Sequence, residues 1–157
     1  SLLDRLTDDE PEEKSEPVAR RGLTKVKLRK SVIRDLNWLF NSSNLAAVQN
    51  LDEYPEVINS VINYGMPDLT GHTLSSIDVP EIERLIKLVI IEFEPRIIRR
   101  TLKIRLTVDS NEMSHNAMTF DIEGELWADP VPLHVYMKTK LDLEIGDIKV
   151  YDYSGGA

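Results

Sequence analysis

The sequence contains no cysteine and few glycines, and no long apolar run. Among its 157 residues there are 7 glycines, and aromatic residues make up 6%. The lack of cysteine excludes a disulfide scaffold, a thiol nucleophile and a cysteine-based zinc site, and it favours a cytosolic compartment. The longest apolar run, Leu88 to Ile91, is far shorter than the roughly 20 residues of a membrane span. The first residues also lack the apolar stretch of a signal peptide.

Charge is plentiful but unevenly distributed. The net charge is −8, which argues against a general nucleic-acid binder. Residues 1–16 hold seven acidic residues, whereas residues 20–34 hold seven basic residues and no acidic one. A second basic cluster spans residues 96–105, and the chain becomes acidic again after residue 121. These charged clusters either suit docking with charged partners or are the solvated faces of an ordinary acidic domain.

The composition divides the chain into an arm and one domain. Residues 1–22 are rich in Asp, Glu, Pro and Ser, which predicts a flexible acidic N-terminal arm. Residues 23–157 have the length of a single domain. Leu2, Leu3 and Leu6 stand out in the arm because one helical turn would bring them together. We expect these leucines to anchor the arm on a partner.

Hydrophobic periodicity predicts two main helices. The first spans Ser31 to Asn41 with Ser31 as N-cap, and the preceding residues 24–30 are either an extended lead-in or an early helical turn. The second runs from Pro80 to Phe93 and ends before Pro95. An apolar segment at residues 57–62 is a short helix or a strand. The side chains expected in the core between helices and sheet are Trp38, Phe40, Leu85, Val89 and Phe93.

Alternating apolar residues predict strands in the C-terminal half. They cover about residues 102–108, 118–126, 135–143 and 148–152, with turns at 109–112 and 144–147. Short turns between consecutive strands indicate an antiparallel meander. The expected fold class is therefore α+β, with a small antiparallel sheet of three to four strands packed against the two main helices. We expect Val135–Leu143 to be an end strand that can accept a partner's strand.

The residues give little support for catalysis or metal binding. The three histidines are far apart and form no ligand motif, so no metal and no cofactor are expected. A glycosidase needs two carboxyl groups across a cleft. Glu92 and Glu94 are the nearest candidates, but residues i and i+2 of a helix point to different faces. A hydrolase therefore remains the minor alternative.

Glu94, Pro95 and Arg96 form the most informative short stretch. Pro95 must end or kink the second helix, and a charged residue stands on each side of it. One interpretation is a kink with a local ion pair between Glu94 and Arg96. The other is that the bend presents both charges to a partner, with Arg96 making bidentate contacts and Glu94 orienting it. The residues alone do not separate these interpretations.

Several motifs occur in an order that resembles the TssE family, the type VI secretion baseplate subunits of the phage-wedge, "lysozyme-like" type. The stretches that carry the resemblance are residues 1–6 (SLLDRL), 34–41 (RDLNWLFN), 54–57 (YPEV), 60–69 (SVINYGMPDL), 93–97 (FEPRI) and 141–146 (LDLEIG). The resemblance covers nearly the whole chain, and Glu94-Pro95-Arg96 corresponds to the triplet that is the hallmark of the family.

The resemblance implies a non-enzymatic, cytoplasmic structural protein in a membrane-docked baseplate. It implies that the chain joins the baseplate wedge and offers a sheath-like surface that anchors or nucleates the contractile sheath. The implied partners are the wedge subunits TssF and TssG, the connector TssK and the sheath subunits TssB and TssC, with no nucleic acid, membrane insertion or small-molecule substrate. The implied contact residues are Glu94, Pro95 and Arg96. The family label leaves a lysozyme-type peptidoglycan hydrolase as the alternative.

Overall fold

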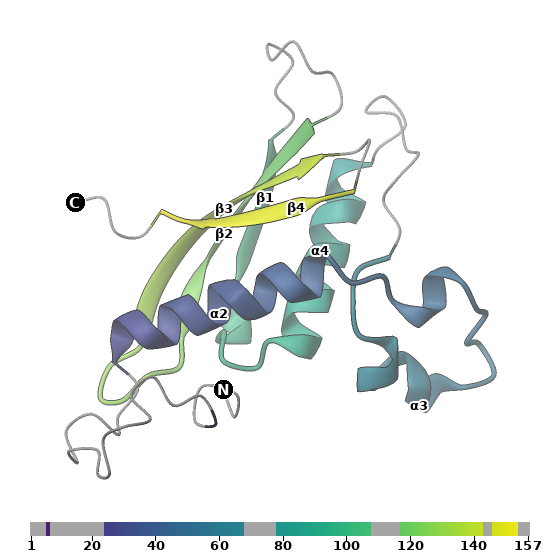
Figure 1. Cartoon of the computed structure of the whole chain (residues 1–157), viewed down its shortest axis with the longest axis horizontal. Helices are drawn as coiled ribbons and strands as arrows, with labels where there is room; N and C mark the ends of the chain where they lie inside the picture. The colour runs from purple at the N-terminus through teal and green to yellow at the C-terminus, as the bar shows by residue number, and fades with distance from the viewer. Residues whose placement is uncertain (1–5, 7–23, 68–77, 108–116, 143–145, 154–157) are drawn as a thin grey trace.

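The computed structural model describes residues 6, 24–67, 78–107, 117–142 and 146–153 (Figure 1). Within them lie the helices α2 (Lys25–Phe40), α3 (Pro55–Ile58) and α4 (Val79–Phe93), and the 3-10 helices η2 (Leu45–Ala47), η3 (Val61–Asn63) and η5 (Arg99–Thr101). The strands are β1 (Lys103–Thr107), β2 (Ala117–Leu126), β3 (Leu133–Asp142) and β4 (Ile148–Asp152). They pair antiparallel in the order β1-β2-β3-β4. The α+β class and the meander are thus confirmed; the predicted turn at 109–112 and part of that at 144–147 lie outside the described residues.

The core lies between one face of the sheet and the helices α2 and α4. Ile104, Ile122 and Met137 stand opposite one another on β1, β2 and β3, and all three are buried. They form one cluster with the buried side chains of both helices. The other face carries charged residues such as the opposed pair Arg105 and Asp121. The alternation seen in the sequence therefore separates a core face from a solvent face.

The prediction of which helix side chains are buried in the core is confirmed only in part. Phe40 is buried as expected, and its ring meets Phe120 edge to face. Trp38 is 50% exposed, so its predicted burial is wrong. It lies beside the apolar stripe of α2, where the Arg34 guanidinium covers its ring at 5.0 Å. On α4 the fully buried residues are Ile86 and Ile90. The expected Leu85, Val89 and Phe93 are partly buried at the margin of the core.

Helix α2 begins well before the predicted start at Ser31. Its N-cap is Thr24, whose side chain accepts a hydrogen bond from the Lys27 backbone N–H at 3.2 Å. Ser31 lies inside the helix, is buried, and donates its hydroxyl proton to the Leu28 carbonyl at 2.9 Å. The predicted cap at Ser31 is therefore wrong, and of the two alternatives for residues 24–30 the helical one holds.

Strand β3 is an inner strand, paired with β2 on one side and β4 on the other. The prediction that Val135–Leu143 forms an end strand is therefore wrong. The outer edge of β4 is covered by the C-terminal end of α2, where the C-cap residue Asn41 accepts from the Ile148 N–H at 2.9 Å and donates to the Ile148 carbonyl at 2.7 Å. One turn earlier, Asn37 accepts from the Val150 N–H at 3.0 Å. Two asparagines thus take the place of a neighbouring strand.

Candidate functional site

The triplet lies at the C-terminal end of α4. The helix ends at Phe93, and Glu94 caps it with φ −123° and ψ 74°, its N–H still bonded to the Ile90 carbonyl. Pro95 excludes the helical conformation at the residue before it, so the chain must turn here. After the turn, the Trp127 N–H donates to the Arg96 carbonyl at 2.8 Å. The segment after Pro95 is therefore fixed against the end of β2.

Glu94 and Arg96 form a two-point ion pair across Pro95. The Arg96 Nε donates to Glu94 Oε1 at 2.6 Å, and its second terminal nitrogen donates to Oε2. The Arg96 backbone N–H also donates to Oε1, at 3.2 Å. Glu94 is 3% exposed, so its carboxylate is almost entirely removed from water. The local ion pair that the sequence suggested is present, and it is bidentate.

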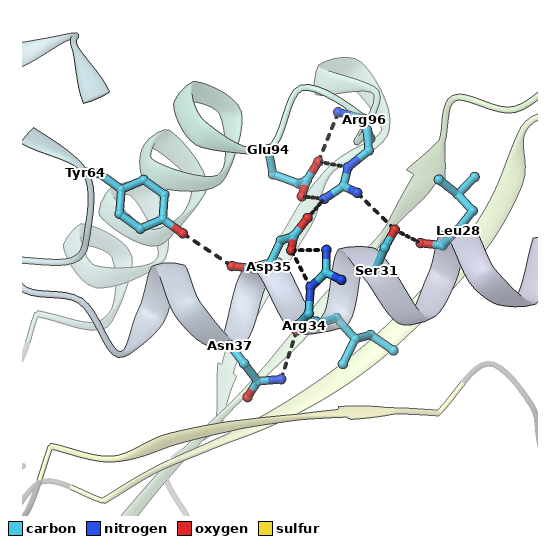
Figure 2. Close-up of polar contacts among 9 residues, drawn as sticks. Leu28, Ser31, Arg34, Asp35, Asn37, Tyr64, Glu94 and Arg96 are labelled. Atoms are coloured by element: carbon cyan, nitrogen blue, oxygen red, sulfur yellow. Dashed lines mark hydrogen bonds and ion pairs between the residues drawn. The ribbon is translucent and has the colours of Figure 1, made fainter. Parts of the chain in front are cut away.

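Arg96 also reaches helix α2, as Figure 2 shows. The nitrogen that contacts Glu94 Oε2 also donates to Asp35 Oδ2 at 2.6 Å, and the other terminal nitrogen donates to the Ser31 hydroxyl at 3.0 Å. Asp35 Oδ1 in turn accepts from Arg34 at 2.9 Å. The guanidinium thereby joins the end of α4 to the middle of α2. We call Ser31, Asp35, Glu94 and Arg96 the clamp.

Arg96 is the cation of the clamp and faces the carboxylates of both Glu94 and Asp35. Burial alone would lower the pKa of Arg96, but hydrogen bonds and charge from Glu94, and then from Asp35, outweigh it and raise the pKa. Tyr64, whose hydroxyl donates weakly to the Asp35 carbonyl at 3.5 Å, also has a raised pKa. The causes are burial first and then the negative charges of Asp35 and Glu94. Arg96 therefore stays charged, and Tyr64 stays neutral well into the alkaline range.

The geometry of the clamp suits mechanical connection better than acid–base chemistry. Both carboxylate oxygens of Glu94 are bound by Arg96, whereas a glycosidase needs two carboxyl groups that face each other across a cleft. Glu92 is exposed. In the part of the chain that the structure describes, no three His, Asp or Glu residues gather as metal ligands. None of its described helices is both long and apolar enough to cross a membrane.

The clamp contains two residues that sequence reasoning did not assign to the site. Ser31 and Asp35 are four residues apart, which places them on one face of α2, and this spacing of polar residues beside an apolar stripe was the available signal. Of the predicted partner contacts, Pro95 is exposed and the Arg96 side chain is 22% exposed. Leu6 is 73% exposed. Leu2 and Leu3 lie outside the described residues.

The fold and the clamp define a structural α+β domain in which an ion-pair network joins the C-terminal end of α4 to α2. Residues 26–131 match the family of the baseplate wedge protein gp25, a span that holds all of α2 but its first residue, and the whole of α4, the clamp, β1 and β2. The match covers more than half of the chain, so this chain belongs to that family. Membership supports a structural role in a baseplate, with other baseplate components as partners. The comparisons with curated proteins and with solved structures found no match.

Proposed function

We propose that this chain is a structural subunit of a type VI secretion baseplate. In this role it joins the wedge through TssF, TssG and the connector TssK. It also offers the sheath subunits TssB and TssC a sheath-like surface that anchors or nucleates the contractile sheath. The observation that carries the proposal is the family match over residues 26–131, which includes the whole clamp. The resemblance of the motifs to the TssE family supports the choice of a type VI machine, in the cytoplasm at a membrane-docked baseplate.

The contact residues we propose are Glu94, Pro95, Arg96 and the leucines of the arm. The Arg96 guanidinium has five N–H groups. Four of them donate to Glu94, Asp35 and Ser31, and among the described residues the fifth is left for a partner. Pro95 is exposed beside it, and Glu94 completes the site by orienting the guanidinium or by pairing with a basic group of the partner. The exposure of Leu6 supports an anchoring role for the arm, residues 1–22, attached to a single domain at residues 23–157.

Binding to individual subunits tests the proposal. The purified full chain is presented to TssF, TssG, TssK, TssB and TssC one at a time, with Arg96→Lys as the site variant and Arg105→Lys on the solvent face of the sheet as control. We expect retention of wedge or sheath subunits, and weaker retention for Arg96→Lys because lysine lacks the planar fork. Failure to retain any of the five subunits would overturn the proposal.

The proposed role requires no catalysis, and this part has its own test. A lysozyme-type hydrolase would release peptidoglycan fragments and would lose that activity in Glu92→Gln or Glu94→Gln. We expect no release by the unmodified chain beyond the buffer control. Release that either substitution abolishes would favour the hydrolase instead. The ion pair between Glu94 and Arg96 supports the non-enzymatic role over the hydrolase alternative.

A further inference from the structure

Residues 44–66 form a small lobe that projects beside the C-terminal end of α2 (Figure 1). The lobe carries η2, α3 and η3, and its two ends are tied together. The Asn44 N–H donates to the Met66 carbonyl at 2.9 Å, and the Met66 N–H donates to the Ser42 carbonyl at 2.7 Å. Gly65 allows this closure, because it has φ +128° and a Cβ there would lie 2.3 Å from the Ser42 oxygen.

The interior of the lobe is also fixed. Asn63 is 7% exposed, and its side chain accepts from the Ala46 N–H and donates to the Ile58 carbonyl, both at 2.9 Å. These two bonds join η2, α3 and η3 through one buried amide. Tyr64 fastens the lobe to the body by packing its ring against Phe93, with centroids 5.3 Å apart. The lobe is therefore held in one shape before any partner arrives, which reduces the entropy lost on binding.

The lobe exposes apolar side chains that the fold leaves in water. They are Val48 at 82%, Val61 at 81%, Ile62 at 65%, Tyr54 at 54% and Ile58 at 39% exposed. They lie on η2, α3 and η3 or at the caps of η2 and α3, and these short helices contact one another, so the side chains are gathered on one small lobe. An apolar patch of this kind marks an interaction site because covering it releases water from apolar area.

The charged residues of the lobe itself have one sign. Asp52, Glu53 and Glu56 are exposed, and residues 44–67 contain no lysine, arginine or histidine. Acidic groups repel nucleic acid and anionic lipid surfaces, and they attract a protein surface that carries lysines or arginines. The exposed apolar side chains and the acidic groups of the lobe thus select for the same kind of partner.

We propose that this lobe is a second docking surface, for a protein whose contact segment presents apolar side chains flanked by lysines or arginines. The surface shares no residue with the clamp, since its exposed residues lie between residues 48 and 62, on or next to η2, α3 and η3. The proposal does not depend on the role of Arg96.

Site-specific photo-crosslinking in the intact machine tests the proposal. A photoreactive amino acid replaces Val61 in the full chain in its native cells, and Tyr151, 50% exposed on β4, is the matched control position. We expect Val61 to crosslink to one protein at a segment rich in apolar and basic residues, and Tyr151 not to do so. The proposal is overturned by crosslinks to a second copy of this chain or to an acidic segment, and equally by no product beyond that of Tyr151.

A binding measurement with the crosslinked partner then tests the chemistry. Val61→Asp combined with Ile62→Asp places charge on the patch, and Val131→Asp, at a residue 59% exposed outside the lobe, is the control. We expect the Kd to rise about tenfold or more for the double variant, as at an apolar hot spot, with an unchanged melting temperature. Asp52→Lys with Glu56→Lys should weaken binding in the same way. An unchanged Kd in both lobe variants would overturn the proposal.

Discussion

Arg96 connects two parts of the chain that are 61 residues apart in sequence. A guanidinium that was only displayed to a partner would contribute little to stability, whereas this one neutralises a carboxylate that is 3% exposed. Arg96→Ala should therefore lower the free energy of unfolding by about 2–4 kcal/mol, since Glu94 would stay buried without its cation. Arg96→Lys should lower the free energy of unfolding by less, because lysine keeps the positive charge although it lacks the planar, two-point geometry of the guanidinium. Urea unfolding measures both.

The control for this prediction is Arg99→Ala, a substitution of an exposed arginine on η5. It should change the free energy of unfolding by no more than about 0.5 kcal/mol. If Arg96→Ala proved as stable as Arg99→Ala, the clamp would not stabilise the fold, and Arg96 would serve only a partner.

Tyr64 reports the negative charge of the clamp. Its pKa is raised, by burial and then by Asp35 and Glu94, so the folded state keeps the phenol proton at a pH where the unfolded chain loses it. The stability that this provides is complete below the unfolded value near 10 and is lost as pH rises through the folded pKa. Tyr64→Phe should flatten the decline of stability above pH 10. Asp35→Asn should move the Tyr64 ionisation to lower pH in an ultraviolet titration; no movement would contradict the assigned electrostatic cause.

At the scale of elements, the spacing of Asn37 and Asn41 matches the strand that they cover. One helical turn on α2 advances about 6 Å in four residues, and two residues of a strand advance about 6.6 Å. Asn41 therefore meets Ile148 while Asn37 meets Val150. Unpaired edge groups are templates for aggregation, and these amides remove them without adding a strand.

Replacing both asparagines by alanine should expose this edge. Each lost side-chain bond to a partly buried backbone group should cost about 1–2 kcal/mol, and the open edge should favour self-association. Hydrogen exchange at the Ile148 and Val150 amides, together with light scattering, measures the two effects. The control is Asn59→Ala, since Asn59 is the exposed C-cap residue of α3. It should leave hydrogen exchange and light scattering unchanged. Unaltered exchange in the double variant would show that the asparagines do not protect the edge.

At the scale of the whole molecule, the arm should matter for assembly and not for stability. Deleting residues 1–16 removes Leu2, Leu3 and Leu6 but no residue of the core cluster that the described residues form, so the melting temperature should stay nearly unchanged while wedge assembly weakens. Serine at all three leucine positions in the full-length chain keeps the acidic residues and tests the anchor alone. A large drop in melting temperature on deletion would instead place the arm within the fold.

The sequence by itself determined the elements and much of the site. Apolar spacing located α4 and every strand of the described sheet to within a few residues, because periodicity reports which face of each element is buried. Pro95 located the end of α4, since proline restricts the residue before it. The ion pair between Glu94 and Arg96 could be proposed from the sequence because the two residues stand on either side of Pro95.

Only the tertiary structure decided which segments meet. A strand pattern does not specify its neighbours, so β3 was mistaken for an end strand until β4 was seen paired to it. The period of a helix does not distinguish a cap from an interior polar residue, so Ser31 was misplaced. Asp35 joined the clamp because packing brings α2 against the end of α4, and Trp38 stayed exposed because that same packing uses the adjacent stripe. Contacts between distant residues depend on how the elements pack, which no local pattern records.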